Sequence, residues 1–296
     1  MVLAPVPAHP RRLVFFGTPE LAVPPLRALI AAKFDVALVV TRADKRRGRR
    51  AEPTPSPVKA AAVELGIPVS HRVDDALDTS ADLGVVVAYG ALIKPHVLER
   101  VPMANLHFSL LPRWRGAAPV ERALLAGDHE TGVCLMQVEE GLDTGGVFAS
   151  ARVAIGNRAT ALALRRELVD VGTRLLVDTL AAGLGAPMAQ QGEATYAAKI
   201  DPEVDLRLEW HRPAAQLDRV VRVGGAWTTF RGRRLKVLDA VPAEGHLEPG
   251  CIDGDAVGTG EGVLALVMVQ PEGRGPMAAS AWRNGARPRP GEALGS

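Results

Sequence analysis

The chain has 296 residues, of which 47% are hydrophobic, so it can bury a sizeable core and disorder throughout is excluded. Its formal net charge of +2 singles out no class of partner. The two cysteines, Cys134 and Cys251, exclude a disulfide framework, and the seven histidines include no metal-binding pairing, so we expect no metal. No apolar run reaches the about 18 residues of a membrane span, and residues 1–12 do not resemble a signal peptide. We therefore expect a cytoplasmic protein without a membrane partner.

The first two thirds of the chain alternate apolar strands with helices. "LVFFG" predicts a buried strand, and the helix after it must hold Pro24 and Pro25 in its first turn. A helix is predicted to begin after Ser56 as N-cap and to end at Gly66, and another covers Ala159 to Leu180. Further strands are predicted in "FDVALVV", "DLGVVVAYG", "NLHFSLL", "TGVCLMQV" and "VFASARVAI". This order predicts an α/β fold with a doubly wound, Rossmann-like and mostly parallel sheet.

The composition changes near Ala189. Residues 189–208 are polar and are predicted to be a linker. After one helical piece, the segments from 209 to 296 are short and separated by glycines, which indicates a small β-barrel. We therefore predict a catalytic domain over residues 1–188 and a smaller barrel domain over residues 209–296.

A polar ladder interrupts the apolar pattern at Asn105, His107 and Ser109, which alternate along a predicted strand and so point to one side. The ladder could simply satisfy loop backbones. However, Asp143 follows the next predicted strand between glycines, and it can reach His107 if the two strands are neighbours. An amide, an imidazole and a carboxylate without a serine or cysteine nucleophile suit direct transfer of an acyl group to an amine. The sequence lacks a G-x-G-x-x-G loop after the first strand, which argues against NAD binding.

The stretch "NLHFSLLPRWRGAAPVERALLAGDHETGVCLMQVEEGLDTG" resembles the signature of the folate-dependent formyltransferases, an Asn-x-His-x-Ser-Leu-Leu-Pro motif with a downstream Leu-Asp-x-Gly. Segments such as "VFFGTPELAVPPL", "TPSPVK", "ATYAAKI" and "VQPEGR" extend the resemblance over residues 12–296. The whole pattern is similar to the members that formylate the methionine of initiator tRNA.

This resemblance implies 10-formyltetrahydrofolate as formyl donor and methionyl initiator tRNA as acceptor, joined through a tetrahedral intermediate. It implies catalytic roles for Asn105, His107 and Asp143, and an OB-like C-terminal domain that helps to hold the tRNA. The folate-binding segment would comprise Ser109, Leu110, Leu111 and Pro112. We assign Tyr89 and Gly90 to the same site, because ligands of such sheets bind at the carboxyl ends of strands. We expect a monomer.

Two basic regions are candidates for contacts with tRNA phosphates. From Arg42 to Arg50 the chain holds six basic residues and one acid, a local net charge of +5. A basic loop can grip phosphates, although it can also be merely solvated. The predicted tRNA-binding residues are Arg42, Lys45, Arg46, Arg47, Arg49 and Arg50 in the first region, and Arg231, Arg233, Arg234 and Lys236 in the predicted barrel.

Two other functions stay open at this point. The acceptor could be a small amine, such as glycinamide ribonucleotide or an amino sugar nucleotide, on the same catalytic domain. The chain could also be an RNA-binding protein whose folate site no longer works. The basic loop and the barrel favour tRNA, and the three filled catalytic positions favour an enzyme.

Overall fold

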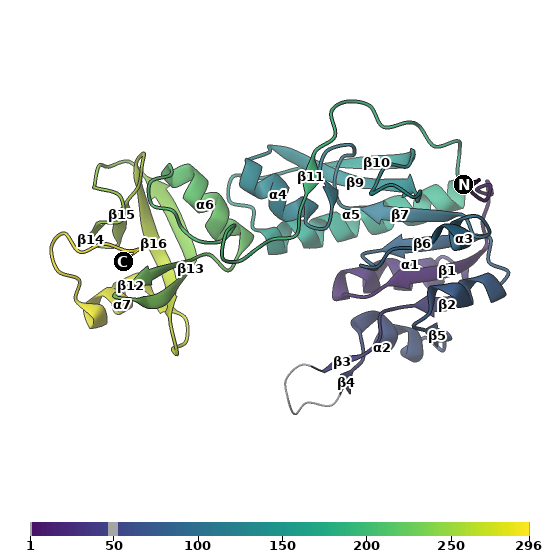
Figure 1. Cartoon of the computed structure of the whole chain (residues 1–296), viewed down its shortest axis with the longest axis horizontal. Helices are drawn as coiled ribbons and strands as arrows, with labels where there is room; N and C mark the ends of the chain where they lie inside the picture. The colour runs from purple at the N-terminus through teal and green to yellow at the C-terminus, as the bar shows by residue number, and fades with distance from the viewer. Residues whose placement is uncertain (1, 47–52, 296) are drawn as a thin grey trace. The chain divides into compact units, whose positions relative to one another are not determined.

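The computed structural model describes residues 2–46 and 53–295, which divide into two compact units. The first unit comprises residues 2–46, 53–119, 130–154 and 165–198, and the second comprises residues 120–129, 155–164 and 199–295. Figure 1 shows the chain coloured from its N-terminus to its C-terminus. Over the described residues, no helix combines the length and the apolar character that a membrane crossing needs.

A seven-stranded sheet forms the centre of the first unit, in the order β10-β9-β7-β6-β1-β2-β5 (Figure 1). The five strands from β7 to β5 pair in parallel, whereas β9 and β10 add an antiparallel edge. The bounds are β1 Arg12–Gly17, β2 Asp35–Val40, β5 Val69–Ser70, β6 Leu83–Val87, β7 Met103–His107, β9 Glu130–Gln137 and β10 Val147–Ala154. All five residues of β6 and five of the six in β1 are buried, as the prediction of a sheet covered on both faces requires.

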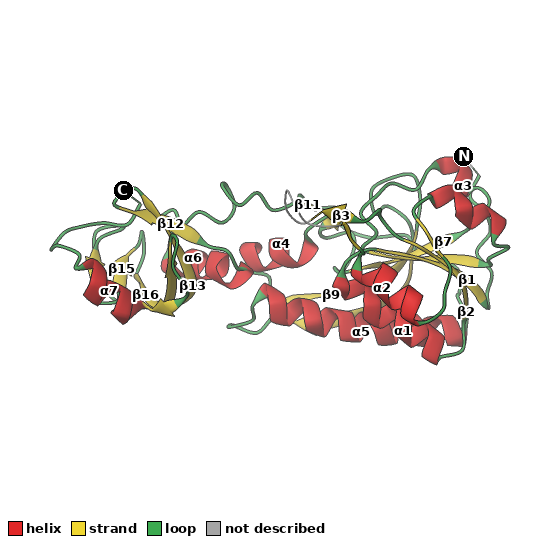
Figure 2. Cartoon of the chain, turned by 90° about the horizontal axis from the view of Figure 1, so that it is seen from below, coloured by secondary structure: helices red, strands yellow, loops and turns green. Residues whose placement is uncertain are grey.

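Helices cover both faces of this sheet, which confirms the doubly wound fold. In Figure 2, α1, α2 and α5 lie along one side of the sheet and α3 lies on the other. The bounds are α1 Val23–Ala31, α2 Pro57–Glu64, α3 Pro95–Leu98 and α5 Ala161–Ala182, with short 3-10 helices at Glu20–Ala22 and Val73–Asp78. The Ser56 hydroxyl accepts a hydrogen bond from the Lys59 amide at 3.0 Å, so the predicted N-cap of α2 is confirmed.

The strand that carries the polar ladder is shorter than predicted. We expected it to run on to Pro112, but β7 ends at His107. A tight turn follows, in which the Arg113 amide donates to the Leu110 carbonyl at 3.1 Å and the Ser109 hydroxyl donates to the Arg113 carbonyl at 2.6 Å. Ser109 therefore lies in the turn after β7, where its hydroxyl bonds a nearby carbonyl, and not in the paired strand.

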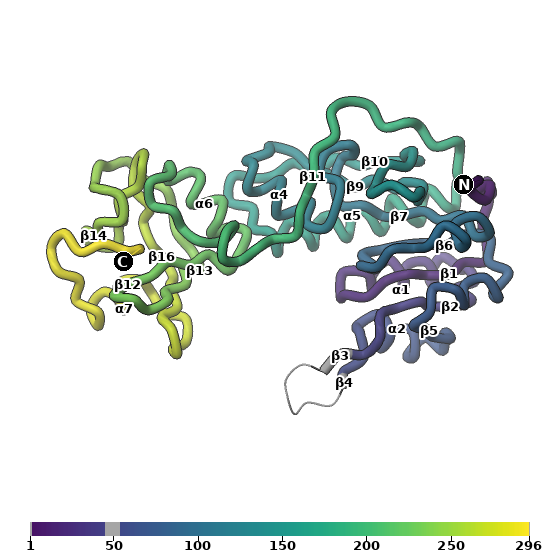
Figure 3. Tube along the Cα trace, in the orientation of Figure 1, coloured from purple at the N-terminus to yellow at the C-terminus, as the bar shows by residue number. Residues whose placement is uncertain are grey.

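The segment after α5 stays with the first unit. In Figure 3 it leaves the end of α5 as an extended tube and reaches β11 (Tyr196–Ala197). There β11 pairs in parallel with β8 (Arg115–Gly116), which follows the turn after β7. A short antiparallel pair, β3 (Lys45–Arg46) and β4 (Pro53–Thr54), flanks residues 47–52.

Antiparallel strands and three helices build the second unit. The sheet order is β12-β13-β16-β15-β14, and β17 pairs with β16, in keeping with an OB-like domain. The bounds are β12 Trp227–Phe230, β13 Arg233–Ala243, β14 Ile252–Asp253, β15 Ala256–Gly258, β16 Val263–Pro271, β17 Met277–Ala278, α4 Pro119–Ala126, α6 Ala214–Val223 and α7 Ala279–Ala286. Its core packs Leu217 and Val221 of α6 and Trp282 of α7 against the sheet, and Leu125 of α4 joins this core.

Candidate active site

Asn105 and His107 lie two residues apart on β7 and therefore share one face of the strand. His107 is buried, with 6% of its side chain exposed, and Asn105 is half-buried. The Nε2 atom of His107 lies 3.0 Å from the carbonyl oxygen of Trp114. Since a carbonyl oxygen only accepts hydrogen bonds, Nε2 carries the proton and Nδ1 of the neutral ring keeps its lone pair.

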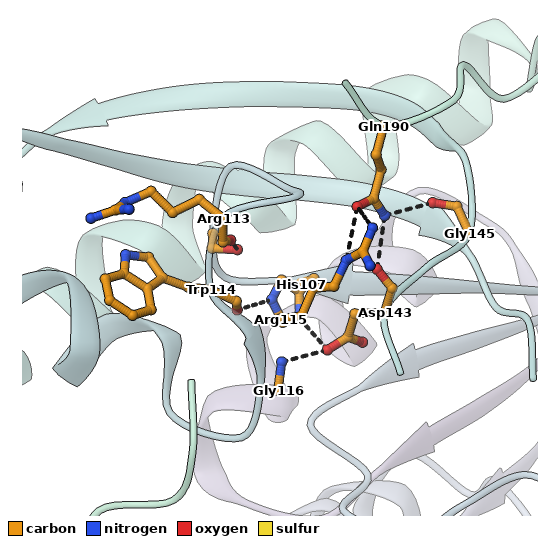
Figure 4. A network of polar contacts seen from close by, with 9 residues as sticks. His107, Arg113, Trp114, Arg115, Gly116, Asp143, Gly145 and Gln190 are labelled. Carbon is orange, nitrogen blue, oxygen red and sulfur yellow. Dashed lines mark hydrogen bonds and ion pairs between the residues drawn. The ribbon is translucent and has the colours of Figure 1, made fainter. Parts of the chain in front are cut away.

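Asp143 reaches His107 from the loop between β9 and β10. Its Oδ2 atom lies 3.6 Å from Nδ1 of His107 and accepts a hydrogen bond from the Gly116 amide at 2.7 Å (Figure 4). Only 16% of the Asp143 side chain is exposed. Two acceptors that face each other do not hydrogen-bond, and this distance is longer than a hydrogen bond. Nδ1 of the neutral ring and the carboxylate thus face each other without a hydrogen bond between them.

Two residues of this site hold strained backbone conformations. Trp114 has φ of 62° and Asp143 has φ of 51°, the left-handed region that residues with a side chain seldom adopt. Gly116, at φ of 119°, approaches the backbone so closely that a Cβ atom there would lie 2.9 Å from the Ala197 carbonyl oxygen. Strain at several residues of one site is typical of functional centres whose surroundings hold the backbone in place.

The turn of the predicted folate segment packs against the sheet. Leu110 lies so close to β9 that a Cβ at Gly132 would meet it at 2.5 Å. Leu110 and Leu111 are half-buried, Pro112 is buried, and the bond between Leu111 and Pro112 is cis. Cys134 of β9 is buried, and burial raises the pKa of its thiol, so it is a core residue rather than a nucleophile.

Tyr89 and Gly90 follow β6 but contribute differently. The Tyr89 ring is buried and packs edge-on against Phe16, with ring centroids 5.6 Å apart, and burial raises the pKa of its hydroxyl. The Gly90 carbonyl accepts a hydrogen bond from Nη1 of Arg42 at 2.8 Å. Arg42 therefore lies beside this strand end, whereas the Tyr89 ring belongs to the core and its carbonyl accepts a hydrogen bond from the Thr18 hydroxyl at 3.1 Å.

The second predicted basic region contains two kinds of residue. Arg231 forms two bonds to Glu292, at 2.6 and 2.7 Å, and Arg234 pairs with Glu203 at 3.0 Å while lying 3.8 Å above the ring of Trp227. Arg233 and Lys236 are exposed on β13. In the first region, Arg47, Arg49 and Arg50 lie outside the described residues. Lys45 and Arg46 are the two residues of β3.

No cluster of three or more His, Cys, Asp or Glu side chains that could hold a metal ion occurs in the described part of the chain. The side chains predicted to be catalytic are an imidazole, a carboxylate and an amide, and they lie on β7 and in the loop after β9.

Sequence reasoning missed two residues of this site, Gln190 and Thr195. Both lie in the segment predicted to be a linker, and both bind the loops that hold His107 and Asp143. The only signal was the stretch "ATYAAKI", which contains Thr195 and which matches the resembled family. Nothing in the local pattern pointed to Gln190.

Comparison with known proteins defines the class. The sequence model of the formyl transferase family matches residues 11–180, and that of the formyl transferase C-terminal domain matches residues 199–287. The N-formyltransferase of Helicobacter canadensis, solved with folinic acid and dTDP-3-aminofucose, has the same fold. It gives a TM-score of 0.67 at 14% identity and covers 86% of this chain and 98% of its own. The doubly wound fold and these matches define a formyl transferase.

Relatives narrow the class. A methionyl-tRNA formyltransferase of Paracoccus denitrificans is 44% identical over 285 residues, which cover 91% of this chain and 95% of the relative. That of Frankia casuarinae is also 44% identical and covers 96% of each chain. The chain belongs to the methionyl-tRNA formyltransferase family.

Proposed function

We propose that this enzyme transfers the formyl group of 10-formyltetrahydrofolate to the α-amino group of methionine on initiator tRNA. The observation that carries the proposal is the His107–Asp143 pair beside Asn105, in a chain similar to methionyl-tRNA formyltransferases over nearly its whole length. All three side chains belong to the first unit, so we propose that a monomer is active.

His107 acts as the general base through Nδ1. The amine of methionine attacks the formyl carbon, and Nδ1 takes the proton that the nitrogen loses as the new C–N bond forms. The hydrogen bond from Nε2 to the Trp114 carbonyl supports this role, because it leaves the lone pair on the nitrogen that faces Asp143. The same proton is returned to N10 of the folate when the tetrahedral intermediate breaks down.

Asp143 and Asn105 stabilise the charges that this step creates. The carboxylate of Asp143, 3.6 Å from Nδ1, attracts the imidazolium once it forms. The amide of Asn105 donates a hydrogen bond to the formyl oxygen as it becomes an oxyanion, a contribution that is typically worth about 10²–10³ in rate. Covalent attachment of the formyl group to the protein is not needed.

The donor would bind along residues 109–112 and beside the backbone of residues 88–90. Leu110 and Leu111 supply half-buried apolar surface, which suits the flat ring system of a folate. The Ser109 hydroxyl already donates a hydrogen bond to the Arg113 carbonyl. We therefore propose that it maintains the shape of the turn and does not bind the folate. Arg233 and Lys236 are the exposed cations of the second unit that we assign to tRNA phosphates.

A single-turnover assay tests the proposal. The enzyme is mixed with 10-formyltetrahydrofolate and either methionyl initiator tRNA or glycinamide ribonucleotide, and formylated product is quantified. Rapid formylation of the tRNA alone is the expected result. Formylation of the small amine alone would keep the folate chemistry and overturn the acceptor. Tight tRNA binding without transfer in either reaction would favour an RNA-binding protein instead.

A further inference from the structure

Gln190 connects three parts of the catalytic site through one side chain. Its Nε2 atom donates to the carbonyl oxygens of Asp143 and Gly145, both at 2.8 Å (Figure 4). Its Oε1 atom accepts from Nε and Nη2 of Arg115, at 3.1 and 2.6 Å. Gln190 thus ties the loop of Asp143 to β8, whose Gly116 amide binds the carboxylate of the same aspartate.

Thr195 supports the other half of the pair. Its hydroxyl oxygen accepts from the Trp114 amide at 2.9 Å, and its carbonyl accepts from the Arg115 amide at 2.9 Å. Trp114 is the residue whose carbonyl fixes the proton on Nε2 of His107. The side chains of Gln190 and Thr195 therefore bind the two strained residues, Asp143 and Trp114, that set the His107–Asp143 geometry.

We propose that Gln190 and Thr195 are positioning residues for formyl transfer, and that their two side chains brace the catalytic pair. Gln190 holds the left-handed backbone of Asp143 by bonding its carbonyl, and Thr195 holds that of Trp114 by bonding its amide. Without these bonds, each residue can relax toward a negative φ and move its catalytic group. The inference rests on the proposed function for its kinetic readout only.

Gln190→Glu is the sharpest variant because it separates the two bonding partners. A carboxylate still accepts from Arg115, but it cannot donate to the carbonyls of Asp143 and Gly145. The matched control is Gln191→Glu, which makes the same change at the exposed neighbouring residue. We expect Gln190→Glu to lower kcat about 10- to 100-fold, with unchanged KM for donor and acceptor, and Gln191→Glu to leave both unchanged.

A double-mutant cycle distinguishes positioning from general stabilisation. If Gln190 acts by placing the Asp143 carboxylate, then Gln190→Glu has no further effect on kcat in an Asp143→Asn background. An equal loss in both backgrounds would overturn the positioning role. Thr195→Val, which removes the hydroxyl, should lower kcat in the same way, and Thr195→Ser, which restores it, should recover the wild-type value.

Hydrogen exchange tests the brace without any activity. In Gln190→Glu, the amides of residues 139–146 should exchange about tenfold faster than in Gln191→Glu, because the loop opens more often, whereas exchange in β1 stays the same. If the wild-type enzyme formylates neither acceptor, this comparison still decides the inference while the proposed function fails. Unchanged exchange in that loop, or unchanged kcat in an active enzyme, would overturn the brace.

Discussion

His107 has two ring nitrogens, and its surroundings assign them different roles. Nε2 donates to a backbone carbonyl, and Nδ1 faces a carboxylate across 3.6 Å. A substitution at either residue of the His107–Asp143 pair should impair the proposed proton transfer. Without the imidazole ring of His107, nothing takes the proton. Without the carboxylate of Asp143, the charged ring loses its nearest counter-charge.

We therefore expect His107→Ala and Asp143→Asn each to lower the single-turnover rate constant of formyl transfer by about 10²-fold or more. The measurement is single-turnover formylation at saturating donor and tRNA, which isolates the chemical step from binding. Binding of tRNA, followed separately by filter retention, should stay at the wild-type level. Turnover close to wild type in either variant would remove that residue from the chemistry.

At the residue scale, the sequence singled out the proposed catalytic residues, but it did not indicate the contacts that hold them in place. Alternation along a strand singles out Asn105 and His107, and Asp143 stands out as an acid between glycines after an apolar strand. The hydrogen bonds from Gln190 and Gly116 to Asp143 could not be predicted, because these residues lie 47 and 27 positions away from Asp143 in the sequence. The local sequence around Gln190 is also what an ordinary polar linker would show.

At the scale of elements, strands that are buried on both faces were predictable because they are continuously apolar. The end of β7 was not predictable, because the residues of "NLHFSLL" beyond His107, the last residue of the strand, have the apolar pattern of a strand as well. Two residues beyond this end, the Ser109 hydroxyl bonds the carbonyl of Arg113, a local contact that the alternation of residues cannot reveal.

Helix α6 holds an acid that should matter for stability. Asp218 is buried, with 7% of its side chain exposed, and accepts from Arg158 at 2.8 Å and from Arg222 at 2.7 Å. Asp218→Asn leaves the mostly buried Arg222 without a counter-charge, so we expect it to lower the free energy of unfolding by about 3 kcal/mol. Urea unfolding followed by circular dichroism measures this loss.

Asp239→Asn is the matched control for that measurement. Asp239 binds the same arginine, Arg158, at 2.9 Å, but about half of its side chain is exposed. Exposed pairs contribute about 0–1 kcal/mol, so this variant should stay close to wild type. Equal losses for the two variants would show that burial does not set the strength of these pairs.

The pairing of Arg231 with Glu292 makes part of the stability depend on pH. Hydrogen bonds from Arg231, and from the backbone of Arg289, lower the pKa of Glu292 from 4.5 to about 2. A carboxylate with a lowered pKa stabilises the fold above its unfolded pKa and loses this effect as pH falls toward its folded pKa. Glu292→Gln should therefore unfold at a lower urea concentration than wild type at pH 7.

The same comparison at lower pH provides the check. Below pH 4.5, the difference in urea midpoint between wild type and Glu292→Gln should shrink steadily with each step toward pH 3. A difference that stays constant over this range would mean that the charge of Glu292 is not what stabilises the contact.

At the scale of the whole molecule, the proposed acceptor demands cations that are available to phosphates. Of the four basic residues predicted in the second unit, Arg233 and Lys236 are exposed on β13, whereas Arg231 and Arg234 are engaged by carboxylates. Each phosphate that binds such a cation releases about one counterion, and this release makes the affinity for nucleic acid depend on the salt concentration.

Arg233→Ala and Lys236→Ala should therefore each raise KM for tRNA and reduce its dependence on salt, while kcat and KM for the donor stay unchanged. Arg174→Ala, at an exposed arginine of α5 outside both predicted basic regions, is the control. Steady-state kinetics at several salt concentrations measures the effect. A KM for tRNA that matches the control at every salt concentration would exclude this face of β13 from the interface.

The second compact unit draws residues 120–129 and 155–164 from within the matched catalytic sequence. Two arginines from these segments, Arg122 and Arg158, bind Asp205 and Asp218 of the later sequence. If relatives exchanged the part of the chain after a crossover at residue 199, the two members of each ion pair would come from different parents. A hybrid gene joined at this point therefore keeps these ion pairs only when both parents encode the same partner residues.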